Sequence, residues 1–195
     1  LWAVLQTRFG NEDLAIQSFR QVLTDAEKLP QTDTLRYITA RIYNRLAFAL
    51  SDLGRYSEAF AAYHKSIENA NKIGHQELEA TCWLNMADEC FKIRELDKSM
   101  EYADQGLKIA RQIGSQENVA YAQATKGAVL LDRGQPEEAK GELEQAMALS
   151  EQIGSAWNMP YMCADLARAY LALSNPDAGY QQATRGVAYA ERVSS

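Results

Sequence analysis

A forty-residue spacing of small side chains is the feature of this sequence that most restricts how the chain can fold. Three columns of residues, each with four members at that spacing, contain only Ala, Gly or Ser. The columns are Ala47, Ala87, Gly127 and Ala167; Ala59, Ser99, Ala139 and Gly179; and Ser66, Gly106, Ala146 and Gly186. Side chains of this size let two helix backbones approach at the short end of the usual ~8–10 Å separation. Each column therefore predicts a helix crossing.

Apolar periodicity and turn residues divide each repeat into two helices. Gly54 and Gly134 fall in mid-repeat, and Ile-Gly pairs end the repeats at 73–74, 113–114 and 153–154, where Gly supplies a left-handed helix cap. The pattern predicts a partial repeat at 1–30, with a helix tail at 1–9, and repeats at about 34–74, 75–114, 115–154 and 155–195. The predicted fold is an all-α superhelix, a single solenoid of antiparallel helix pairs over 1–195.

Helix starts are predicted from capping residues and from Pro. Ser57 and Asp97 precede apolar-periodic segments and are expected to be N-caps. Pro136, Pro160 and Pro176 are expected in first turns, where the missing N–H costs no hydrogen bond.

Small residues at the eighth, twentieth and twenty-seventh positions of the unit, with Tyr43 or Trp83 four residues before the first, resemble the tetratricopeptide repeat. That repeat is usually about 34 residues long. The forty-residue unit resembles longer variants in spindle-orientation adaptors and bacterial signalling or regulatory proteins. Lys126 departs from the pattern because other copies have an apolar residue there. A HEAT-type solenoid also fits the period, but its signature does not predict the three small columns.

Composition limits which kinds of partner and cellular setting the sequence predicts. The formal charge of −6 and pI of about 5.0 argue against a nucleic-acid groove, which needs clustered Lys and Arg. No apolar stretch is long enough to span a bilayer, and no secretory signal pattern opens the chain. Three cysteines, an odd number, indicate unpaired core thiols and a cytoplasmic setting. The chain begins without Met in mid-pattern, so we expect a fragment of a longer protein.

No catalytic, metal or cofactor site is predicted. The two histidines, His64 and His75, have no metal-ligand spacing and are expected to be solvated. Phosphate loops, nucleophile elbows and HExxH motifs are absent from the sequence. We therefore expect a protein that is not an enzyme.

The resemblance implies that the first helix of each repeat lines a concave groove for a protein or peptide. Carried onto this register, the expected groove residues are Arg41, Asn44, Arg45, Phe48, Leu84, Asn85, Asp88, Tyr121, Thr125, Tyr161, Asp165 and Arg168. Arg41, Asn44 and Arg45 could hold a carboxylate by charge-assisted hydrogen bonds. The alternative is that Tyr121 and Tyr161 stack between helices and the charges are solvated.

The expected function is a non-catalytic binding scaffold, as in the sensory or regulatory region of a larger signalling or transcription-regulating protein. A basic clamp for chaperone tails is disfavoured because Asp88 and Asp165 oppose the cations; a longer peptide or a partner helix fits better. The alternative function is self-association, as a homodimer through the last helix, whose Tyr180 and Val187 have nothing after them to cover them.

Overall fold

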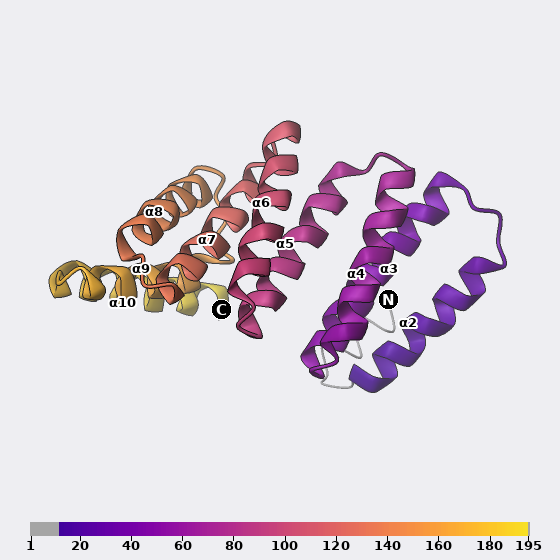
Figure 1. The fold of residues 1–195 in the computed structure, drawn as a ribbon, viewed down its shortest axis with the longest axis horizontal. Coiled ribbons are helices and arrows are strands. Elements are labelled where there is room, and N and C mark those ends of the chain that lie inside the picture. The colour runs from indigo at the N-terminus through magenta and orange to yellow at the C-terminus, as the bar shows by residue number, and fades with distance from the viewer. Residues whose placement is uncertain (1–11, 195) are drawn as a thin grey trace.

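The computed structural model describes residues 12–194, which form a row of nine helices (Figure 1). The helices are α2 (Glu12–Glu27), α3 (Asp33–Asp52), α4 (Tyr56–Lys72), α5 (Gln76–Lys92), α6 (Leu96–Ile113), α7 (Gln116–Asp132), α8 (Pro136–Gln152), α9 (Met159–Ala172) and α10 (Pro176–Ser194). The helix predicted at 1–9 lies outside the described residues.

Consecutive helices pack into hairpins, and the hairpins stack. The pairs α3/α4, α5/α6, α7/α8 and α9/α10 make the most extensive contacts, and the second helix of each pair also packs on the first helix of the next. The array runs from α2 at one end to α10 at the other (Figure 1). The predicted all-α superhelix of antiparallel helix pairs is therefore confirmed.

The small columns lie where the hairpins are tightest. All twelve of their residues are buried. A Cβ added at Gly106 would come within 2.5 Å of Leu84 Cδ2, and one added at Gly186 within 3.0 Å of Cys163 Cβ. The columns thus mark helix crossings, as predicted, because at these positions there is no room for a larger side chain.

The turns repeat as regularly as the helices. The residue that ends the turn inside each hairpin has positive φ, at Gly54 (70°), Arg94 (66°), Gly134 (74°) and Ser174 (60°). Gly74, Gly114 and Gly154 play the same part between hairpins. Gly adopts this left-handed conformation without the Cβ clash that other residues suffer, so Arg94 and Ser174 carry a backbone cost.

Two predicted N-caps are wrong. The caps of α4 and α6 are Arg55 and Glu95, and neither uses its side chain. Ser57 and Asp97 lie inside the first turns, where the Asp97 carboxylate still favours the helix dipole. The predicted placement of Pro136 and Pro160 in first turns is confirmed.

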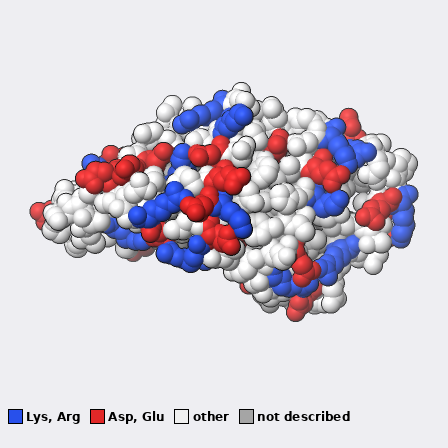
Figure 2. Space-filling model, in the orientation of Figure 1, with Lys and Arg blue, Asp and Glu red and all other residues white. Residues whose placement is uncertain are grey.

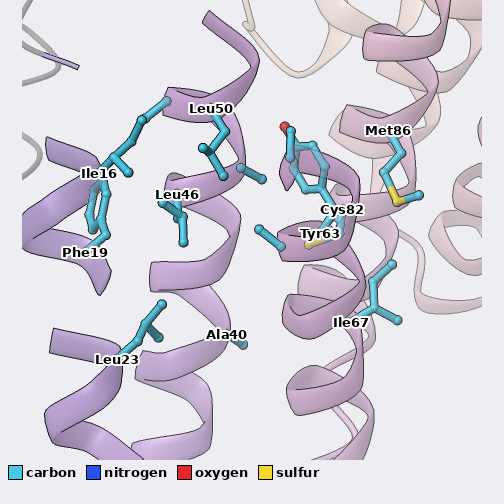
Figure 3. Close-up of a cluster of buried hydrophobic side chains, with 14 of the residues drawn as sticks. Ile16, Phe19, Leu23, Ala40, Leu46, Leu50, Tyr63, Ile67, Cys82 and Met86 are labelled. Carbon is cyan, nitrogen blue, oxygen red and sulfur yellow. The ribbon is translucent and has the colours of Figure 1, made fainter. Parts of the chain in front are cut away.

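The core consists of clusters that each join neighbouring helices. Figure 3 shows Ile16, Phe19 and Leu23 of α2 facing Leu46 and Leu50 of α3. Beyond them Tyr63 and Ile67 of α4 and Met86 of α5 continue the cluster, and a second cluster joins α8 and α9. No helix among the described residues is apolar and long enough to cross a membrane.

Candidate functional site

The first helices of the hairpins form the inner face of the array. Contacts join α3 to α5, α5 to α7 and α7 to α9, whereas no contact of this extent joins one second helix to the next within residues 12–194. In a curved stack the closer-spaced helices lie on the inside of the bend. The inner face therefore belongs to α3, α5, α7 and α9.

A cavity of about 450 Å³ opens among these helices. Its walls come from every hairpin of the array, so no single repeat could form it. The lining residues are Asn44, Arg45 and Phe48 of α3; Glu77, Thr81 and Asn85 of α5; Glu117, Asn118, Ala120 and Tyr121 of α7; Ser150 and Ile153 at the end of α8; and Ser155, Trp157, Asn158 and Met162 around the start of α9.

The cavity brings together some of the residues predicted for the groove and leaves others apart. Asn44, Arg45, Phe48, Asn85 and Tyr121 line it. Leu84 does not reach it: its side chain is fully buried and faces Gly106 of α6. Because successive helix residues point about 100° apart, Leu84 turns into the hairpin while its neighbour Asn85 faces the groove.

The remaining predicted residues lie around the cavity. Thr125 is buried and its hydroxyl donates to the carbonyl oxygen of Tyr121 at 3.1 Å. Arg41 is exposed, with its guanidinium over the ring of Tyr37. Asp88 pairs with Lys92 at 3.0 Å. Tyr161 is exposed to solvent.

Asp165 and Arg168 belong to a chain of ion pairs. Arg168 contacts Asp165 and Asp132, each at 2.8 Å, and Asp132 also pairs with Arg94. Burial raises the pKa of the Asp165 carboxyl, against the opposing influence of Arg168. The Arg168 guanidinium is thus already engaged by two carboxylates of the protein.

Side-chain amides connect the walls of the cavity. Asn85 Nδ2 donates to Asn44 Oδ1 at 3.1 Å and so links α5 to α3. Asn118 Nδ2 donates to Glu77 Oε1 at 2.9 Å and links α7 to α5. Asn85 and Asn118 are themselves buried, at 4% and 7% exposure, so these hydrogen bonds tie neighbouring walls of the cavity together.

Aromatic rings supply the apolar part of the wall. Tyr121 meets Trp157 edge to face, with ring centroids 6.3 Å apart. Phe48 packs edge to face against the fully buried Tyr63. Burial raises the pKa of the Tyr121 hydroxyl, so the ring stays neutral at physiological pH.

Trp157 is a lining residue that the sequence pattern missed. It lies in the connection between α8 and α9 and remains 67% exposed at the mouth of the cavity. A signal existed in Pro160, which delays the start of α9 and leaves this connection longer than its equivalents. Glu77, Glu117 and Asn118 were missed because they lie earlier in their helices than the positions that the resemblance assigns to the groove.

The two histidines and three cysteines contribute to helix capping and to packing. His75 Nδ1 accepts the Leu78 N–H at 3.2 Å as the N-cap of α5, and His64 lies edge-on to Trp83. His75 is therefore a cap, which corrects the expectation of a solvated side chain. Cys82, Cys90 and Cys163 are buried, free thiols. The described residues contain no group of three or more His, Cys, Asp or Glu that could hold a metal ion.

Comparisons with known proteins agree with this geometry. Residues 38–112 match the family model of the tetratricopeptide repeat. BtubC from P. vanneervenii is 19% identical with a TM-score of 0.79 over 99% of this chain and 78% of that one. The putative kinesin light chain TPR-like repeats of Podosopora anserina are 18% identical, with a TM-score of 0.72 over 99% and 93%.

A third similar structure is the Rap conjugation gene regulator of plasmid pLS20, solved in complex with the Phr* peptide. It is 14% identical, with a TM-score of 0.82 over 99% of this chain and 52% of the regulator. The chain thus spans about half the length of that protein. No curated protein matches the sequence.

The stacked hairpins and their inner groove define a helical-repeat solenoid. Residues 38–112 match the tetratricopeptide repeat, and the stacked helix pairs on either side of that stretch share the fold of tetratricopeptide-like solenoids. Lys126, which departs from the repeat pattern, remains compatible with it because its amine reaches Asp104 at 2.7 Å while most of its side chain is shielded from solvent.

Proposed function

We propose that this chain is a non-catalytic protein-binding scaffold and that the cavity on its inner face binds a peptide segment of a partner. The observation that carries the proposal is the cavity itself, in which three aromatic rings, a set of amides and charges of both signs from four hairpins face one space. Peptide grooves combine apolar anchors with main-chain hydrogen bonds in this way.

Two further observations support binding as the role. The pLS20 regulator, which shares the fold, was solved with a peptide bound. Lys, Arg, Asp and Glu are interspersed on the face in Figure 2, which suits a partner of mixed charge better than a polyanion. We place the scaffold in the cytoplasm, as the regulatory region of a larger signalling or transcription-regulating protein.

Selection from a random displayed peptide library tests the proposal. Thr81→Trp would fill the cavity with an indole, since Thr81 lines it and is half-buried. Ala61→Trp adds the same residue to an exposed position of α4 as a matched control. We expect the wild type and Ala61→Trp to enrich the same peptides and Thr81→Trp to lose them while its circular dichroism is unchanged. Equal enrichment by all three proteins would refute the proposal.

The last helix favours a second candidate function, self-association. Val187 is 59% exposed, whereas its equivalents Ile67, Leu107 and Met147 are buried to 7%, 5% and 3% exposure by the hairpin that follows each of them. Tyr180 on the same helix is 76% exposed. If this face joins two copies, sedimentation will show a dimer that Val187→Glu converts to a monomer. A wild-type protein that sediments as a monomer at high concentration would exclude the second candidate.

A further inference from the structure

The cavity has opposite charges on opposite walls. Arg45 on α3 and Glu117 on α7 both line it, and the structure gives neither an ion pair nor a hydrogen bond to another described side chain. Both residues are exposed. Arg168 of the same face, by contrast, is matched through the chain of ion pairs that includes Asp132. Two unmatched charges at the ends of a cavity are available to a ligand.

A second residue of like charge lies near each of these two residues. Arg41 precedes Arg45 by one helical turn and is exposed, so the α3 wall presents two guanidinium groups to an anion. Glu77 of the intervening α5 also lines the cavity and is tied to the start of α7, because its Oε1 accepts hydrogen bonds from Ser115 at 2.8 Å and Asn118 at 2.9 Å. The field across the cavity therefore runs from a basic end to an acidic end.

The distance between these ends limits the length of the ligand. The helices α3, α5 and α7 contact one another in sequence, and packed helices lie about 8–10 Å apart, so α3 and α7 are roughly 16–20 Å apart. An extended chain rises about 3.3 Å per residue. In the forty-residue register Glu117 lies eight residues before the equivalent of Arg45, an axial offset of roughly 12 Å, so about six or seven residues span the gap.

We propose that the groove selects peptides by charge order, binding an extended segment of about six residues with a cationic group at Glu117 and a carboxylate at Arg45. A large apolar side chain between them lies against Tyr121 and Trp157. This inference rests on the proposed function and deepens it. The carboxylate is either the C-terminus of the ligand or an Asp or Glu side chain, since both offer the same two oxygens to a guanidinium.

A displayed library of random hexapeptides that follow a neutral linker and end in a free C-terminus tests the charge order. The proteins are the wild type, the double variant Arg45→Glu with Glu117→Arg, and the cavity-filled Thr81→Trp. Arg45 and Glu117 are exposed, so the swap leaves the core and the net charge unchanged. We expect the wild type to enrich Lys or Arg at one end and Asp or Glu at the other, and the swapped variant to enrich the reverse order.

Synthetic copies of the enriched peptides then identify the source of the carboxylate. If it is a side chain, Asp→Asn or Glu→Gln weakens binding by about tenfold and amidation of the C-terminus has little effect; a terminal carboxylate gives the opposite result. Enrichment without charge order, or an order that the swap leaves unchanged, overturns the inference and leaves the proposed function standing. If the wild type enriches nothing beyond what Thr81→Trp enriches, both fail.

Discussion

Ser99 on α6 donates a 2.7 Å hydrogen bond from its hydroxyl to the carbonyl oxygen of Ala87 on α5. Two of the small columns therefore meet in one crossing. The third column repeats the device, since Ser66 on α4 donates to the carbonyl oxygen of Ala40 on α3 at 2.7 Å. Small side chains bring the backbones close enough for a short hydroxyl to reach across, and these two hydrogen bonds link the helices of the α3/α4 and α5/α6 hairpins.

Replacing Gly127 with Ala should destabilise the protein. The added Cβ would lie 2.5 Å from Leu143 Cγ and 3.3 Å from the carbonyl oxygen of Ala139, and because Leu143 is fully buried, its displacement would disturb the surrounding core. Overpacking of this kind costs about 1–3 kcal/mol, only partly offset by the better helix propensity of Ala, worth up to ~1 kcal/mol. Urea unfolding should show a net loss of roughly 1–2 kcal/mol.

Gly141 supplies the matched control. It also lies in a helix, α8, but a Cβ there would meet nothing within 4 Å. Gly141→Ala should therefore stabilise the protein by about 0.5–1 kcal/mol through helix propensity alone. If both variants shifted the unfolding midpoint in the same direction, the crossing at Gly127 would not be as tight as its geometry indicates.

Ser174→Gly should stabilise the turn between α9 and α10. Ser174 has a φ of 60°, and its equivalent Gly134 has a φ of 74°. A side chain in the left-handed region costs about 1–2 kcal/mol. Replacing it with Gly removes this cost, but part of the gain is lost because Gly gives the unfolded chain more conformational entropy. We expect a net gain of about 0.5 kcal/mol and a higher melting temperature. The reverse change, Gly134→Ser, should lower the melting temperature, and an increase there would contradict the argument.

The thiols should be inert while the protein is folded. Burial raises the pKa of Cys82 to about 12 and of Cys90 to about 11, and raises that of Cys163. Because the thiolate is the reactive form, raised pKa values and burial both slow modification. Ellman's reagent at pH 8 should label none of the three within minutes in the native protein and all three in guanidinium chloride. Rapid native labelling of Cys82 would show that α5 opens locally.

The sequence predicted the stack better than it predicted the groove. Small residues such as Ala47 and Gly127 recur because every crossing imposes the same steric limit, so a periodic pattern records them. Groove residues face a ligand that differs between proteins, so no steric requirement repeats every forty residues at their positions. Leu84 was assigned to the groove but is buried, whereas its neighbour Asn85 lines the cavity. A shift of one residue along a helix turns the side chain by about 100°, so an error of one position moves a residue from the groove into the core. Trp157 was missed because α9 starts late, at Met159, which leaves Trp157 in the connection before the helix.

Pro160 is the residue that delays α9, and this can be tested. The helices α5 and α7 begin at Gln76 and Gln116, so a strict repeat would begin α9 at Ala156. In that helix Pro160 would be the fifth residue, and its ring would clash with the carbonyl of Ala156. The helix begins instead at Met159, where Pro160 falls in the first turn.

Pro160→Ala should therefore let α9 extend towards Ala156 and draw Trp157 into the helix, away from Tyr121. Hydrogen exchange should show new protection of the amides around residue 160, and the peptides selected by the wild type should bind more weakly because one wall of the cavity has moved. Pro136→Ala is the matched control, because α8 already begins at Pro136, forty residues after the start of α6 at Leu96, and should change neither measurement. Unchanged exchange in Pro160→Ala would mean that the connection itself, rather than the proline, holds Trp157 over the cavity.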